Sequence, residues 1–314
     1  MTMNAQQVGS RPTLYALNVG RGDAFFIEIP ADDHPYVVLI DGGDRFIDEK
    51  IEPFRFVRHK GWSHIDLMIL THLHPDHIIG LLNVAKHVPV REAVLPYPRI
   101  PLPSGEMRNA KAVQTAGLFR AYGRLWELLC EQQTRVSLRP PFGEQNVWRF
   151  GETRLRHLDP TEKSDLAAYA IAELLDSVPA EQQERLCAAF DARSNGDSSV
   201  WLLEQADGTH LFLFGGDALL ANWERITKRE ILRPHGFKVP HHGMKDAWNE
   251  HLLKLLSPDW VMITNDSKEY EIFRDEWNQL AQCSGCRLVV TGSQPNTHYW
   301  SSQLPSLPER IELA

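Results

Sequence analysis

The most constraining feature of this chain is the heptapeptide THLHPDH at residues 71–77, which directly follows the apolar run 65–70. The run predicts a buried strand. Pro75 disfavours helical conformation at the residue before it, so the chain stays extended through the first two histidines. The residues that follow predict a helix over 76–88. A fold built on this sequence must therefore bring a strand end, a loop and a helix start together at one point.

Four side chains of this peptide, those of His72, His74, Asp76 and His77, are potential metal ligands. His72 and His74 are two residues apart on extended chain and therefore project to one side. Asp76 and His77 form a second pair in the first turn of the helix. Imidazole and carboxylate groups suit zinc, iron and manganese, and two pairs suggest two divalent metal ions. The alternative is that the histidines merely cap the helix.

The HxHxDH pattern resembles that of the metallo-β-lactamase fold superfamily, whose members are mostly hydrolases with one or two metals. Four further segments resemble the superfamily's other parts and occur in its order: the opening strands at 17–24, the buried-aspartate turn at 39–43, the strand ending in a metal-bridging aspartate at 213–218, and the late histidine motif at 237–243. The resemblance covers most of residues 12–300. It implies an α/β fold of four layers, the αββα metallo-β-lactamase sandwich, which fits the predicted alternation of strands and helices. The predicted helices include those over 164–176, 180–192 and 273–282.

The sequences of these motifs narrow the resemblance to one subfamily. The NVGxGDA start, the SSVWLL strand after Asn195, the GDA turn and the HHG motif together resemble the β-lactamase-like domain of ComEC competence proteins and its soluble relatives. The chain departs from that pattern at Met244, where serine usually stands, and at 267–270, which replace later Asn and His-Pro elements. The resemblance of the motif sequences to ComEC-type domains implies a phosphodiester substrate.

The resemblance implies a role for each motif residue. The implied metal ligands are His72, His74, Asp76, His77, Asp217 and His241. In this scheme the first two histidines hold one metal, Asp76 and His77 hold the second, and Asp217 bridges the two ions. Asp76 is also expected to take part in catalysis.

The remaining candidate residues leave alternatives open. His241 is the expected late ligand of the second metal. His242 is interpreted as a second ligand, as a catalytic proton donor to the leaving group or as an orienting partner, and the pairing of the two histidines could be reversed. A third ligand of the first metal is unassigned, with His157 and Asp159 as candidates. Asp41 is either a buried residue that steadies the HxHxDH loop or an ordinary turn residue before two glycines.

Composition and length indicate one domain over residues 1–314, because 43% of the 314 residues are hydrophobic and no linker is evident. The core is expected over about 12–300, with helical insertions at about 97–150 and 160–195 that shape the substrate pocket. The longest apolar runs fall far short of the ~20 residues that span a bilayer. The start of the chain lacks the basic flank and apolar centre of a secretion signal. These features predict a cytoplasmic protein without a membrane segment.

Charge and motifs together favour one reaction class. The net charge of −8 gives no support to extensive duplex binding. We expect a metal-activated water, with zinc as the metal and manganese or iron as alternatives, to hydrolyse a phosphodiester in a nucleotide or single-stranded nucleic acid. Lys238 and Lys245 beside the late motif are interpreted as positive charge near a phosphate or as solvated lysines. The alternatives are a lactone, β-lactam or thioester hydrolase, and a non-catalytic metal-stabilised binding module.

Overall fold

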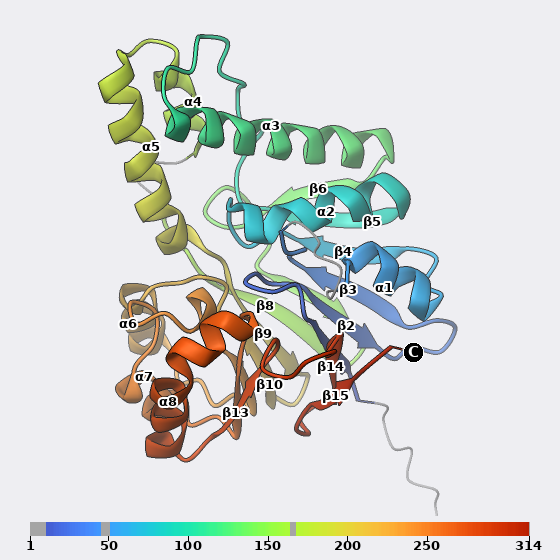
Figure 1. Cartoon of the computed structure of the whole chain (residues 1–314). Coiled ribbons are helices and arrows are strands. Elements are labelled where there is room, and N and C mark those ends of the chain that lie inside the picture. The colour runs from blue at the N-terminus through green and yellow to red at the C-terminus, as the bar shows by residue number, and fades with distance from the viewer. Residues whose placement is uncertain (1–10, 45–50, 164–167, 314) are drawn as a thin grey trace, which may run out of the picture.

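The computed structural model of the chain describes residues 11–44, 51–163 and 168–313. The strands of this part form two sheets (Figure 1). The first sheet has the strand order β15-β14-β1-β2-β3-β4-β5-β6, with the bounds β1 Thr13–Leu17, β2 Phe25–Ile29, β3 Tyr36–Ile40, β4 Ile65–Ile69, β5 Val90–Leu95, β6 Arg135–Leu138, β14 Tyr299–Gln303 and β15 Glu309–Ile311. The second sheet has the order β13-β12-β11-β10-β9-β8-β7, with the bounds β7 Val147–Phe150, β8 Thr153–Asp159, β9 Val200–Gln205, β10 His210–Phe214, β11 Gly236–Lys238, β12 Trp260–Ile263 and β13 Arg287–Val290.

Apolar side chains alternate along the strands and so divide the core into layers. In β1, Leu14 lies in the cluster between the two sheets, whereas Tyr15 lies in the cluster on the outer face of the first sheet. In β10, Phe212 lies between the sheets, whereas Leu213 lies on the outer face of the second sheet. Both faces of both sheets are therefore apolar, and each outer face requires a cover.

Helices supply these covers (Figure 1). The outer face of the first sheet is covered by α1 Pro53–Lys60, α2 Pro75–His87 and α3 Ala110–Glu131. The outer face of the second sheet is covered by α6 Leu220–Arg229, α7 Glu250–Leu256 and α8 Ser267–Ser284. Two further helices, α4 Ala168–Leu175 and α5 Ala180–Ser194, pack against α3. The predicted four-layer αββα sandwich is thereby confirmed. Within the described ranges, no helix combines the length and the hydropathy needed to cross a membrane.

Several elements differ from the sequence prediction. The sequence pattern missed α1 and the strands β6, β7, β14 and β15. Residues 97–150 contain α3, as expected of a helical insertion, but they also supply β6 and β7, one edge strand for each sheet. The helix α8 begins six residues earlier than its predicted start at residue 273, because the Asp266 side chain accepts hydrogen bonds from the first free backbone N–H groups. The first four residues of the helix predicted over 164–176 lie outside the described residues.

Strand direction brings the candidate residues to one edge of the sandwich. β3, β4 and β5 run parallel in the first sheet, and β10 to β13 run parallel in the second. The carboxyl ends of parallel strands meet at one edge of a sheet. The loops that leave β3, β4, β10 and β11 at this edge carry Asp41, the 71–77 peptide, Asp217 and the His241–Gly243 turn, respectively.

Candidate metal centre

The 71–77 peptide adopts the strand, loop and helix conformation that its sequence predicts. β4 ends at Ile69, and His74 is extended with φ −128° and ψ 153° as the residue before the helix. Pro75 is the first residue of α2, where its missing N–H costs nothing because that group has no partner within the helix. The imidazoles of His72 and His77 are fully buried. This conformation places the four polar side chains at the start of α2.

Two glycines let the start of α2 contact the turn after β3. The N–H of Gly42 donates to the carbonyl oxygen of His77 at 2.7 Å, and the N–H of Gly80 donates to that of Gly43 at 3.1 Å. A Cβ on Gly80 would lie only 1.9 Å from the carbonyl oxygen of Gly42. The absence of side chains here therefore fixes α2 beside the turn and brings His77 next to Asp41.

Asp41 combines both roles that its sequence context suggested. It adopts the left-handed conformation of a turn residue, with φ 57°. Its buried carboxylate also accepts hydrogen bonds from the Thr71 N–H at 2.8 Å and the Thr71 hydroxyl at 2.7 Å. The same carboxylate lies 2.8 Å from Nδ1 of His77 and, as an acceptor, takes the proton of that nitrogen. Asp41 thereby steadies the loop and leaves Nε2 of His77 to face the cluster.

The first group of potential ligands comprises His72, His74 and Asp217, and their ligand atoms all lie within 4.8 Å of one another. Nε2 of His72 is 3.1 Å from Nδ1 of His74 and 3.8 Å from Oδ2 of Asp217. Asp217 is held in place by its backbone N–H, which donates to the Ser198 hydroxyl at 2.8 Å. The sequence scheme placed these three residues at one ion, and the structure brings them together.

The second group comprises Asp76, His77 and His242, and its ligand atoms also lie within 4.8 Å of one another. Nε2 of His242 is 3.3 Å from Oδ2 of Asp76 and 3.3 Å from Oδ2 of Asp217. Nε2 of His77 is 3.4 Å from the same Asp217 oxygen. One oxygen atom, Oδ2 of Asp217, therefore faces the imidazoles of both groups.

The late histidine pair differs from the sequence expectation. Both His241 and His242 have positive φ, at 47° and 52°, so the segment is a left-handed turn and not a strand. His242 is completely buried and points into the second group, where His241 was expected. His241 lies at the rim, with Nδ1 2.8 Å from Asp246 and Nε2 3.2 Å from the amide nitrogen of Asn195. The geometry thus corresponds to the reversed pairing.

Sequence reasoning missed a buried lysine at the base of the cluster. The sequence offers two interpretations of Lys238, positive charge near a phosphate or a solvated side chain, and the second is wrong because the side chain is fully buried. Its Nζ lies 2.6 Å from Oδ2 of Asp23 and 3.4 Å from Oδ1 of Asp217, and it donates to the Gly216 carbonyl oxygen at 2.6 Å. Lys245 is 74% exposed and pairs with Glu276 at the surface. β11 lies between β10 and β12 in the second sheet, a placement that no sequence pattern signalled.

The two candidates for a third ligand of the first metal lie in other surroundings. Asp159 accepts from Asn222 at 2.8 Å and forms ion pairs with Arg225 and Arg229 at 3.0 and 3.2 Å. The His157 ring packs edge-on against the Trp201 ring, with centroids 5.0 Å apart. In the described part of the chain, neither belongs to a group of potential ligands with the motif residues.

Burial and mutual charge set the protonation of the cluster. Burial lowers the pKa of His72 well below its usual value, and the neighbouring imidazoles lower it further. Burial also lowers the pKa of His242, but the carboxylates of Asp217 and Asp76 outweigh this effect and raise it to about 9. Burial raises the pKa of Asp217, yet the adjacent histidines and Lys238 hold it well below its usual range. Protons on buried imidazoles therefore balance the carboxylates in the metal-free chain.

The donor set fits divalent metal ions. The Nε2 atoms of His74, His77 and His242 are buried and have no hydrogen-bond partner among the described residues. Nδ1 of His242 lies 3.0 Å from the Thr264 carbonyl oxygen, which can only accept, so this nitrogen carries a proton. Buried polar atoms of this kind normally require a partner. Nitrogen and oxygen ligands at these positions suit zinc, manganese or iron.

Comparison with known proteins agrees with this site. Residues 17–142 match the sequence profile of the metallo-beta-lactamase superfamily. The matched segment spans less than half of the chain. It contains Asp41 and the complete HxHxDH motif, whereas Asp217 and His242 lie beyond the matched residues.

Further similarities are more distant. A curated protein, 2-C-methyl-D-erythritol 4-phosphate cytidylyltransferase of Enterobacter sp. (strain 638), is 27% identical over 85 residues, which are 27% of this chain and 36% of that protein. The chain thus spans less than two thirds of that relative. A mutant of CmlA beta-hydroxylase superposes with a TM-score of 0.49 at 14% identity, covering 89% of this chain and 52% of the other. A diphosphatase of the PhnP family gives 0.44 at 13% identity, covering 89% and 95%.

Proposed function

We propose that this protein is a hydrolase that uses two divalent metal ions to cleave phosphodiesters. The observation that carries the proposal is the position of Oδ2 of Asp217, which lies 3.3–3.8 Å from ring nitrogens of three histidines belonging to both ligand groups. In the proposed site, His72 and His74 would hold the first ion, and Asp76, His77 and His242 would hold the second. Asp217 would be the ligand common to both, and Nζ of Lys238 lies 3.4 Å from its other oxygen, Oδ1.

The residues of the chain prepare this site before any ion binds. When bound, two divalent ions activate a water molecule and balance charge that develops on the ester oxygens. Asp41 and the Thr264 carbonyl oxygen hold the Nδ1 protons of His77 and His242, so that both Nε2 atoms face inward. Lys238 compensates part of the buried negative charge of Asp23 and Asp217. These hydrogen bonds fix the orientation of both rings, which reduces the reorganisation that metal binding requires.

His241 has a different role in this proposal. Its ring lies at the rim of the cluster between Asp246 and Asn195, and its side chain is 18% exposed. A histidine paired with a carboxylate at the edge of a hydrolytic site is suited to donate a proton to a leaving group. We assign this function to His241, which leaves His242 as a metal ligand.

Two observations favour a phosphodiester over a carbonyl ester. The motif residues resemble those of ComEC-type domains, and cationic side chains gather in a pocket beside the cluster. A pair of divalent ions would also suit the two oxygens of a displacement at phosphorus. A lactone, β-lactam or thioester hydrolase is the second candidate within enzymes. A metal-stabilised binding module is the candidate outside catalysis.

The deciding experiment is hydrolysis of bis(p-nitrophenyl) phosphate by protein reconstituted separately with zinc and with manganese. Asp76→Ala removes a proposed ligand and is expected to abolish turnover. Asp275→Ala, at a carboxylate that is 96% exposed on α8, is the matched control and is expected to keep it. Cleavage of p-nitrophenyl acetate without cleavage of the diester would favour the carbonyl-ester alternative. Stoichiometric metal binding without turnover of either ester would favour the binding module.

A further inference from the structure

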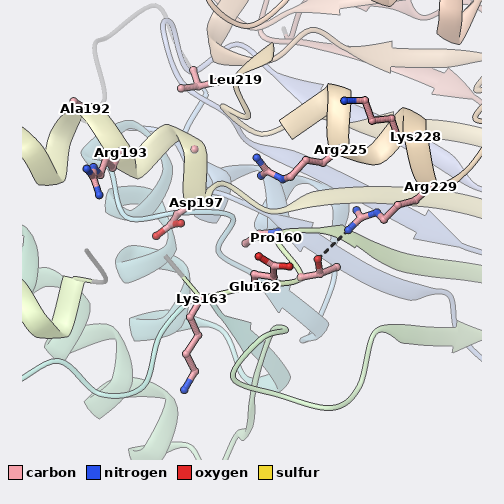
Figure 2. A pocket seen from close by; sticks show the side chains of 12 residues that line it. Pro160, Glu162, Lys163, Ala192, Arg193, Asp197, Leu219, Arg225, Lys228 and Arg229 are labelled. Atoms are coloured by element: carbon pink, nitrogen blue, oxygen red, sulfur yellow. Dashed lines mark hydrogen bonds between the residues drawn. The ribbon is translucent and has the colours of Figure 1, made fainter. Parts of the chain in front are cut away.

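A pocket of about 700 Å³ opens between the end of α5, the loop after β8 and the helix α6 (Figure 2). Two features place its walls beside the proposed metal centre. Leu219 lines the pocket and follows Asp217 by two residues, which limits their separation along the backbone to about 7 Å. Asp191, next to the lining residue Ala192, lies 3.7 Å from Nε2 of His74. The pocket is therefore a neighbour of the proposed metal centre and not a remote cavity.

The lining of this pocket is cationic although the chain as a whole carries a net charge of −8. Its cationic side chains are Lys163, Arg193, Arg225, Lys228 and Arg229. Its acidic side chains are Glu162 and Asp197, which leaves a surplus of three positive charges. Such local concentration of one sign of charge in a concave surface attracts anions.

Two of the cations are fixed by a buried carboxylate beneath the pocket. Arg225 and Arg229 both pair with Asp159, and Figure 2 shows their side chains with that of Lys228 along one side of the pocket. Arg193 lies on the other side. Arg193 and Lys228 are exposed and have no ion-pair partner within the described residues. Even with Asp159 counted, positive charge remains available to a ligand on both sides.

We propose that this basic pocket binds a second, non-scissile phosphate group of the substrate. This inference rests on the proposed phosphodiesterase function and names its substrate class: a nucleotide phosphodiester that carries a further phosphate next to the one that is cleaved. Phosphate is the ligand that arginine forks and lysine ammonium groups recognise best. Binding a remote anionic group would also position the ester at the ions.

The kinetic test compares two chromogenic substrates, thymidine 5′-(p-nitrophenyl phosphate) and the same compound with a 3′-phosphate. We expect the 3′-phosphorylated substrate to have a kcat/KM about tenfold to hundredfold higher, the range for one or two charge-assisted contacts. The double variant Arg193→Ala/Lys228→Ala should lose this preference and keep the rate on the simpler substrate. The matched control Arg120→Ala/Lys86→Ala, at exposed cations on α3 and α2, should change neither.

Equal kcat/KM values for the two substrates in the unmodified protein would overturn the inference. A double variant that slows both substrates equally would also overturn it, because the two cations would then act on the centre and not on the extra phosphate. The preference should diminish at high ionic strength, since the pocket is open to solvent.

A binding measurement separates failure of this inference from failure of the proposed function. Thymidine 3′,5′-bisphosphate is titrated into the protein by calorimetry, and the double variant should bind it at least about tenfold more weakly than the control variant does. This difference without any diester turnover would refute the phosphodiesterase proposal and support the pocket. Diester turnover with no difference in bisphosphate binding would refute the pocket alone.

Discussion

Substitution of Asp41 by asparagine tests how the chain prepares His77 for metal binding. Oδ2 of Asp41 is shared by the Thr71 hydroxyl and by Nδ1 of His77, while Oδ1 accepts from the Thr71 N–H. An amide cannot reproduce this pattern of acceptors. With its NH₂ group toward His77, the proton of that ring must move to Nε2, the proposed ligand atom. With the amide reversed, the NH₂ group instead faces the N–H of Thr71.

The size of the effect follows from the contacts that are lost. The hydrogen bond between Nδ1 of His77 and the Asp41 carboxylate is charge-assisted, and such bonds contribute about 1.5–3 kcal/mol. A loss of this size corresponds to roughly a tenfold to hundredfold weaker affinity for the second ion. The first ligand group, which makes no contact with Asp41, should lose less.

The assay is competition for zinc against a chromophoric chelator, which resolves the two affinities. Glu92→Gln is the matched control, because Glu92 is a buried carboxylate of β5 that accepts from the Trp148 Nε1–H at 2.8 Å and belongs to no group of potential ligands among the described residues. The reasoning is refuted if Asp41→Asn leaves both zinc affinities unchanged, or if Glu92→Gln lowers them equally.

Three further outcomes are expected. His242→Ala should reduce bound zinc from two ions to one by elemental analysis, whereas His241→Ala should keep both ions and lower kcat. Loss of an ion in His241→Ala and not in His242→Ala would restore His241 as the metal ligand, as expected from sequence. Gly80→Ala should lower the free energy of unfolding, measured by urea denaturation, by about 1–3 kcal/mol, because its Cβ would lie 1.9 Å from the carbonyl oxygen of Gly42. Gly117→Ala on α3 is the control and should not destabilise the fold, because the nearest atom to its Cβ is 3.9 Å away. Burial holds the pKa of His157 well below 6.5 in the folded chain. Below pH 6.5 the unfolded chain therefore binds a proton that the folded chain does not. The free energy of unfolding should fall as the pH is lowered through this range, by up to about 1.4 kcal/mol per pH unit. His157→Gln should flatten this part of the pH profile, and an unchanged profile would show that the ring is not buried neutral.

Much of the architecture was predictable because it depends on local patterns. The apolar run 65–70 and Pro75 predict a strand followed by a helix start, and the structure has β4 and α2 there. Helix α5 begins at the predicted Ala180 and runs two residues beyond its predicted end. Three of the four missed strands, β6, β7 and β15, are edge strands. β6 and β15 contain no buried residue, so their sequences carry no strong apolar alternation.

The sequence by itself determined the strand-loop-helix conformation of residues 71–77 and the order of the motifs, because both follow from periodicity and from proline's restricted backbone. Only the tertiary structure decided which late histidine enters the cluster and where Lys238 lies. His241 and His242 both sit in left-handed conformations, which no alternation rule anticipates. The burial of Lys238 depends on Asp23, 215 residues earlier in the chain, because a lysine can be buried only where carboxylates distant in sequence compensate its charge.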